Sequence, residues 1–350
     1  MELTFTDPLG RVRDLTLLVG PNTSGKTTIL DAIAAALGPT LEMPTLRRGF
    51  ERTPRTVVRR GALHARVTCW LRFSPEEVAA TRELFELAAH YEEVPDTQEV
   101  VLTWTYPDPR NQSTFGYTRQ DPKPGWTLLK GRVTAARLLS TRRVDWNWFR
   151  RVGGVFTFDQ ERTGLGKTIS RQIWNIIHGD MEATPEKDDR WTADPRTILI
   201  AMALQALIPP ATTEPVVRPD FDVIRERYAQ ICGPRKIVGV VRDGPEFDIS
   251  FNDGHQEYQY DGLSSGERMV LLLLIRFVAE HMHQSLVLID ELELNQHPLW
   301  QRKLLHLIPR MGDGNQIIAT THSPYLRDAV PPEAVIDLGD LGDGPGVGED

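Results

Sequence analysis

Apolar residues occur along this chain in two patterns, which together predict an α/β fold. Leu15–Val19 is a short continuous apolar run, and apolar residues at helical spacing follow it over 29–37. The helix is expected to end at Gly38, which a proline follows. Later in the chain, residues 286–289 and 316–320 are apolar on both faces, as in central strands of a parallel sheet. We therefore expect a parallel core sheet flanked by helices.

Alternating patterns add antiparallel strands to this expectation. Residues 61–73 and 98–106 alternate as half-buried strands do, and they enclose a helix that begins after Ser74, its expected N-cap. This content predicts a mixed N-terminal sheet. Further along, Asp-Gly turns separate three short strands. Those strands are expected at 236–242, 246–251 and 256–260, a fourth short strand at 155–158, and helices at 166–178, 196–208, 221–231 and about 269–283.

Composition narrows the class of protein. The 350 residues have an ordinary globular composition and a net charge of -8. The longest apolar run, 269–275, is far too short to cross a bilayer, so no membrane partner is expected. Cys69 and Cys232 offer neither a disulfide framework nor metal-ligand spacing, and Met1 leads directly into a strand pattern. We expect a cytoplasmic protein.

A phosphate-binding loop follows the first strand. Gly20 and Gly25 stand at the spacing that lets the backbone N–H groups turn inward toward phosphate oxygens. Lys26 can reach the β- and γ-phosphates, and the Thr27 hydroxyl can bind Mg²⁺. The chain is thus expected to bind a nucleoside triphosphate through Gly20, Pro21, Asn22, Thr23, Ser24, Gly25, Lys26, Thr27 and Thr28.

Three further motifs lie between 260 and 325 and complete a second half of the site. Ser264, Ser265, Gly266 and Glu267 stand at the start of an apolar helix, where backbone N–H groups can meet an anion. Strand 286–289 ends in two carboxylates. Asp290 is expected to hold Mg²⁺ and Glu291 to orient the attacking water, while the strand that ends at Thr320 brings His322 to the same sheet edge.

The order of these motifs resembles the Walker A, signature, Walker B and histidine-switch motifs of ABC-type ATPase heads. More narrowly, residues 289–298 and 320–325 are similar to the SMC/RecF-like ATPases, a group that includes overcoming-lysogeny nucleases and Septu-type anti-phage ATPases. The resemblance implies a P-loop NTPase of ABC-ATPase type that uses ATP and Mg²⁺. It covers residues 10–38 and 235–330, about a third of the chain. Leu292 replaces the proline that usually follows the acidic pair.

In this family, two heads enclose two nucleotides between them. The resemblance implies a homodimer in which Ser264, Ser265, Gly266 and Glu267 act on the nucleotide of the partner copy. His322 would touch the γ-phosphate, and Glu291, His322 and Lys26 would be catalytic. Asn295 would lie in the loop that crosses the dimer interface, and Gln160 would join Thr27 and Asp290 at the metal.

Basic residues are concentrated in the first half of the chain. Residues 1–175 carry 25 Lys/Arg against 19 Asp/Glu, and the second half reverses this balance. The densest cluster is a candidate DNA contact, with a solvated surface as the alternative; its central residues are Arg47, Arg48, Arg52, Arg55, Arg59 and Arg60. A second cluster, interleaved with Trp146 and Trp148, comprises Arg132, Arg137, Arg142, Arg143, Arg150 and Arg151.

The sequence thus predicts an ABC-type head from residues 1–40 and 221–350, with an inserted α/β lobe at 41–220 that contacts a partner or nucleic acid. The favoured function is an ATP-hydrolysing switch that controls a separate effector, a nuclease or a toxin, in anti-phage defence. A RecF-like genome-maintenance ATPase is the alternative. A transporter nucleotide-binding subunit is disfavoured, because Leu263–Glu267 reads Leu-Ser-Ser-Gly-Glu instead of Leu-Ser-Gly-Gly-Gln.

Overall fold

The computed structural model describes residues 1–37, 62–106, 124–141, 143–159, 195–207, 220–244 and 246–339. The chain forms two compact units. Unit 1 comprises residues 1–159, 282–292 and 312–350, and unit 2 comprises residues 160–281 and 293–311. The predicted division into a head and an inserted lobe stays a prediction.

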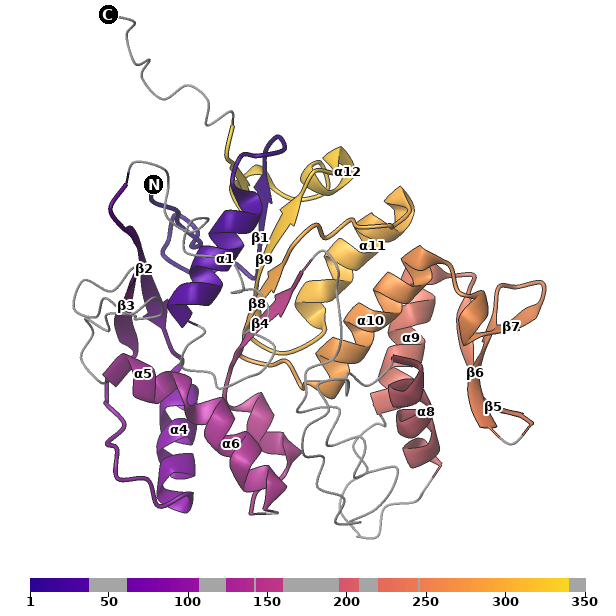
Figure 1. The fold of residues 1–350 in the computed structure, drawn as a ribbon, viewed down its shortest axis with the longest axis horizontal. Coiled ribbons are helices and arrows are strands. Elements are labelled where there is room, and N and C mark those ends of the chain that lie inside the picture. The colour runs from indigo at the N-terminus through magenta and orange to yellow at the C-terminus, as the bar shows by residue number, and fades with distance from the viewer. Residues whose placement is uncertain are drawn as a thin grey trace, which may run out of the picture. The chain divides into compact units, whose positions relative to one another are not determined.

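Unit 1 is built on a parallel five-stranded sheet of order β10-β1-β9-β8-β4 (Figure 1). Every pair of neighbouring strands is parallel. The strands are β1 (Leu15–Val19), β4 (Val155–Phe158), β8 (Leu286–Ile289), β9 (Gln316–Thr321) and β10 (Val335–Asp337). Most of their side chains are buried, as the apolar runs predicted, so the parallel core sheet of an α/β protein is confirmed.

An antiparallel ribbon and several helices complete unit 1. The strands β2 (Ala65–Arg72) and β3 (Glu99–Tyr106) pair along their whole length, and the core lies between this ribbon, α1 (Lys26–Leu37) and the parallel sheet. The Ser74 side chain caps α4 by accepting from the Glu77 backbone N–H, as predicted. The remaining elements of unit 1 are α4 (Pro75–Leu87), α5 (Pro124–Leu129), α6 (Gly131–Ser140), α12 (Pro324–Arg327) and 3-10 turns at Trp146–Arg150 and Pro332–Ala334.

Unit 2 combines helices with a small antiparallel sheet. The predicted strands are confirmed as β5 (Lys236–Asp243), β6 (Glu246–Asn252) and β7 (Glu257–Gln259), which pair in that order. The long helix α10 (Ser265–Ala279) buries most of its apolar side chains and packs against α9 (Asp220–Cys232). The other elements are α8 (Pro195–Ala206), α11 (Pro298–Leu307) and 3-10 turns at Tyr260–Gly262 and Ile308–Arg310.

The structure also bears on the two cysteines and on the apolar helices. Both cysteines are free thiols, and burial raises the pKa of Cys69 to about 11 and that of Cys232 to about 12. Within the part of the chain that the structure describes, no helix combines the length and the apolar character needed to traverse a bilayer. The helix predicted at 166–178 lies outside the described residues.

Candidate nucleotide and magnesium site

The phosphate-binding loop joins the carboxyl end of β1 to the start of α1, as the sequence predicts. Gly25 has a positive φ of 90°, a conformation that strains residues with a side chain. A side chain at Gly20 would meet the Ser24 Oγ at 2.7 Å. The Ser24 Oγ is buried and has no hydrogen-bond partner among the described residues. A buried donor of this kind beside a turn of backbone N–H groups fits a phosphate.

Lys26 places its charge at the mouth of this loop. The side chain is only 5% exposed, and its Nζ donates to the carbonyl oxygens of Gly20 and Pro21, both at 2.8 Å. These contacts hold the ammonium over the loop, where a phosphate oxygen can bind it. The arrangement favours an anionic ligand and fits the nucleotide predicted from the sequence.

Two of the three predicted magnesium-binding side chains, Thr27 and Asp290, are in contact, although 263 positions separate them in the sequence. The Thr27 Oγ1 donates to both carboxylate oxygens of Asp290, at 2.9 Å and 3.1 Å. Asp290 is 6% exposed and follows β8 directly. Hydroxyl and carboxylate oxygens are ligands that Mg²⁺ accepts, and it normally completes its shell with phosphate oxygens and water. The described residues contain no group of three or more His, Cys, Asp or Glu side chains that could hold a metal by themselves.

Glu291, the predicted base, has a left-handed backbone conformation with φ of 48°. Its backbone N–H donates to the Thr320 Oγ1 at 2.8 Å, and the Thr320 Oγ1 in turn donates to Asp290 Oδ1 at 2.6 Å. The role of Thr320 could not be predicted from the sequence, because a threonine at a strand end carries no local signal of its partners. The acidic pair is therefore held from the neighbouring strand β9.

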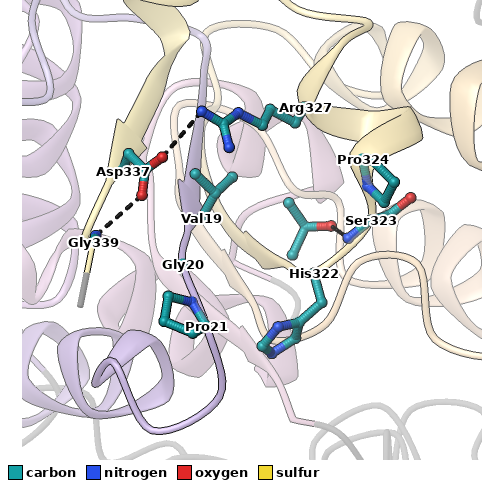
Figure 2. A pocket seen from close by; sticks show the side chains of 10 residues that line it. Val19, Gly20, Pro21, His322, Ser323, Pro324, Arg327, Asp337 and Gly339 are labelled. Atoms are coloured by element: carbon teal, nitrogen blue, oxygen red, sulfur yellow. Dashed lines mark hydrogen bonds and ion pairs between the residues drawn. The ribbon is translucent and has the colours of Figure 1, made fainter.

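His322 lies one residue beyond β9 and lines a cavity of about 450 Å³. The start of the phosphate-binding loop forms another part of the lining, through Val19, Gly20 and Pro21. Figure 2 shows the rings of His322 and Pro21 at the same end of this cavity. The structure thus brings His322 to the loop, as predicted.

The predicted signature residues lie in unit 2, at the start of α10. Ser264 is the N-cap and forms a capping box with Glu267. Ser264 and Ser265 are exposed, whereas Gly266 and Glu267 are buried. A side chain at Gly266 would lie 2.5 Å from the Asn295 carbonyl oxygen, so the helix start packs directly on the loop that carries Asn295.

The buried Glu267 carboxylate is surrounded by donors that sequence reasoning missed. It accepts from the hydroxyls of Tyr228 at 2.9 Å and Tyr258 at 2.7 Å, and Arg235 lies 3.4 Å away. Burial acts to raise the pKa of Glu267, but the hydrogen bonds from Ser264 and the two tyrosines hold it below its usual value. Glu267 therefore supports the helix start from inside unit 2, and a contact of its own with a partner's nucleotide stays a prediction.

The remaining candidate residues fall into two groups, those outside the described residues and those with contacts elsewhere in unit 1. Gln160 and the arginines 47–60 lie outside the described residues. In the second basic cluster, Arg132 is buried between the rings of Phe149 and Phe156. Arg151 forms ion pairs with Glu76 and Glu83 and lies over the Trp148 ring. These two arginines serve the fold, whereas Arg137, Arg143 and Arg150 are exposed, and a nucleic-acid contact at those three stays a prediction.

Comparisons with known proteins match two parts of this chain to AAA-domain families. Residues 203–328 match a family model described as "AAA domain, putative AbiEii toxin, Type IV TA system", and residues 2–69 match a second AAA-domain model. The chain is similar to the Septu protein PtuA of Bacillus thuringiensis, with 34% identity over 106 residues, which is 27% of each protein. It is also similar to the Retron Vc95 probable ATPase of Vibrio cholerae serotype O1 biovar El Tor, with 27% identity over 109 residues.

These matches are partial in length. The retron match spans 28% of this chain and 21% of that protein, so the chain spans about a quarter of each curated relative. Among solved structures, an SMC head bound to the C-winged helix domain of ScpA has a TM-score of 0.48 at 14% identity, covering 91% of this chain and 85% of that one. The SMC head domain from Thermotoga maritima has a TM-score of 0.38 at 14% identity, covering 91% and 84%. The family models and the curated relatives confirm the resemblance to AAA-type ATPases, among them the Septu protein that the sequence resembles.

Proposed function

We propose that this chain is an ATP-driven switch of the SMC-like ABC type, a proposal supported by its two AAA-domain matches and by the ATPase named among its relatives. Two copies close head to head on ATP, hydrolysis separates them, and this cycle controls a separate effector or DNA binding. The relatives are named for the Septu and retron systems, which supports a role in anti-phage defence.

The observation that carries the proposal is the contact between Thr27 and Asp290 at the carboxyl edge of the parallel sheet. Ligands in open α/β sheets bind at this edge. A magnesium ion, when bound there, would neutralise phosphate charge in the transition state. Thr27 and Asp290 would hold it, with Gln160 as a third candidate, and Lys26 would bind the phosphates.

Hydrolysis then needs a base and an electrostatic partner for the transferred phosphoryl group. Glu291 is placed after Asp290 to accept a proton from the attacking water, and the water attacks the γ-phosphate in line with the leaving oxygen. His322 faces the start of the loop from the neighbouring strand and would bind the γ-phosphate there. Glu291 lies just after β8 and His322 just after β9, and these two strands are neighbours in the same sheet.

The exposed hydroxyls of Ser264 and Ser265 support the dimer. They stand at the start of a 15-residue helix, where the positive end of the helix dipole favours an anion. In the proposed dimer this helix start, with Gly266, meets the γ-phosphate bound by the partner copy, and Asn295 lies in the loop beside it.

Glu291→Gln tests the proposal directly. The variant should lose at least about 100-fold in the rate of phosphate release, because the amide cannot accept the proton. It should still bind ATP, and size-exclusion chromatography with light scattering should show an ATP-dependent dimer. Glu333→Gln makes the same chemical change at an exposed position outside the site and should leave the rate unchanged. A Glu291→Gln variant that hydrolyses ATP at the wild-type rate would refute the assignment of the base.

A further inference from the structure

Thr320 occupies a central position in the site. It is the fifth residue of the six-residue strand β9 and is fully buried, with 0% of its surface exposed. In the sheet order, β9 lies between β1, which leads into the phosphate-binding loop, and β8, which leads into the acidic pair. The register pairs Thr320 with Leu18 on one side, and Ala319 with Ile289 on the other.

Three successive residues of the acidic loop are hydrogen-bonded to this threonine. Its Oγ1 donates to Asp290 Oδ1 at 2.6 Å and accepts from the Glu291 backbone N–H at 2.8 Å. Its carbonyl oxygen accepts from the Leu292 backbone N–H at 3.0 Å. The first two bonds belong to the side chain, so a substitution can remove them while the third remains.

The direction of these bonds follows from their partners. A backbone N–H can only donate and an ionised carboxylate can only accept, so the one hydroxyl proton must point to Asp290. The bonds then form a chain from the Glu291 N–H through the hydroxyl to the carboxylate, and each bond polarises the next. This series of hydrogen bonds fixes one oxygen of Asp290. It also holds Glu291 in its left-handed backbone conformation, which a non-glycine residue adopts only when its surroundings enforce it.

We propose that Thr320 is a positioning residue for ATP hydrolysis, acting through Asp290 and Glu291. This inference rests on the proposed ATPase function. Its hydroxyl sets the carboxylate that receives the metal and the backbone of the residue that receives the proton. Because β9 continues to His322, the same strand end aligns the histidine with the acidic pair.

Thr320→Val removes the hydroxyl and keeps the shape of the side chain, whereas Thr320→Ser keeps the hydroxyl. The valine variant should lose at least about tenfold in kcat, since a hydrogen bond to a charged group is lost and the Glu291 N–H loses its acceptor. The Mg²⁺ concentration for half-maximal rate should rise, and ATP binding measured in EDTA should not change. The serine variant should recover kcat to within about threefold of the wild-type value.

Thr16→Val is the matched control. Thr16 is also a fully buried threonine of the same sheet, in β1, and its Oγ1 has no hydrogen-bond partner within the described ranges. Its kcat and Mg²⁺ dependence should match those of the wild type. If Thr320→Val does not fold, as judged by thermal unfolding, Thr320→Ala replaces it under the same criteria.

Three results would overturn the inference. Wild-type kcat and Mg²⁺ dependence in Thr320→Val would show that the hydroxyl positions nothing. Loss of ATP binding in EDTA would show that Thr320 supports the loop and not the acidic pair. A folded Thr320→Ser variant with the valine phenotype would assign the effect to packing of the methyl group. Normal ATP hydrolysis by Glu291→Gln would instead refute the proposed function itself, and this inference with it.

Discussion

Replacing Glu267 by alanine tests whether the start of α10 is held from inside unit 2. The carboxylate is 3% exposed and accepts from the Ser264 backbone N–H at 3.0 Å and the Ser264 hydroxyl at 2.6 Å through Oε2. Its Oε1 accepts from Tyr228 and Tyr258. Alanine removes both acceptor oxygens and with them these four hydrogen bonds, so the tyrosine hydroxyls lose the oxygen they share.

The expected loss of unfolding free energy can be estimated from the hydrogen bonds that Glu267→Ala removes. Tyr228 is fully buried, and an unsatisfied buried hydroxyl costs about 1–3 kcal/mol. Loss of the capping box adds about 1 kcal/mol. With partial solvation of Tyr258, which is half-buried, Glu267→Ala should lower the free energy of unfolding of unit 2 by about 3–5 kcal/mol. Glu267→Gln keeps one acceptor oxygen for the tyrosines and should cost about 1–2 kcal/mol.

The pH dependence of the unfolding free energy separates the contribution of the Glu267 charge from that of its packing. Because the folded-state pKa of Glu267 lies below the value in the unfolded chain, the ionised group stabilises the fold above that unfolded value of 4.5. The contribution is lost as pH falls through the folded pKa. Urea unfolding at a series of pH values should show this acid-side loss in the wild type and not in Glu267→Gln.

Function gives a second readout for the same variants. Glu267 and the phosphate-binding loop belong to different units, so ATP binding by a single copy should not change. ATP-dependent dimerisation should weaken, since the exposed Ser264 and Ser265 lose their fixed orientation. Glu246→Ala, an exposed change in the same unit, is the control. A loss of less than about 1 kcal/mol in Glu267→Ala would refute the assigned hydrogen-bond network.

Two further predictions concern other parts of the chain. Burial raises the pKa of Glu77 from 4.5 to about 7, so the folded state holds a proton that the unfolded chain releases. Stability should therefore fall by about 3 kcal/mol as pH rises through this window, and Glu77→Gln should abolish the slope in urea unfolding at pH 5 and pH 8. Separately, DNA binding should weaken, with a shallower salt dependence, when the arginines 47–60 are changed to glutamine; an unchanged slope of log K against log salt would contradict a phosphate contact.

Local signals in the sequence were sufficient for most of the fold. The apolar run at 286–289 predicted a buried strand, and Ser74 and Ser264 predicted helix starts, because a strand pattern or a cap is complete within a few residues. The helix α6 was not predicted. It begins after Lys130 without a side-chain cap, and its buried face includes an arginine, Arg132, which interrupts the apolar spacing.

Contacts between residues far apart in the sequence could not be predicted from such local patterns. Thr320 and Asp290 are 30 positions apart, and Tyr228 and Glu267 are 39 apart. A threonine on a strand or a tyrosine on a helix has no local pattern that identifies a carboxylate as its partner. Arg132 is a further case in which the local sequence does not identify the partner. Its charge suggested a solvated or nucleic-acid surface, whereas two aromatic rings enclose it in the structure.

The strand order explains why Thr320, which the sequence did not single out, matters for the chemistry. The motifs alone predicted that the phosphate-binding loop and the acidic pair meet at one sheet edge, but not which strand separates them. In the structure that strand is β9, so the end of β9 lies between the loop after β1 and the carboxylates after β8, and it adds to the direct contact of Thr27 with Asp290. Thr320 and His322 both lie there, and one contacts the acidic pair while the other lines the cavity beside the loop. A polar residue at Thr320 is therefore a consequence of placing β9 between the two halves of the site, because an apolar residue there would leave the Glu291 N–H without its acceptor.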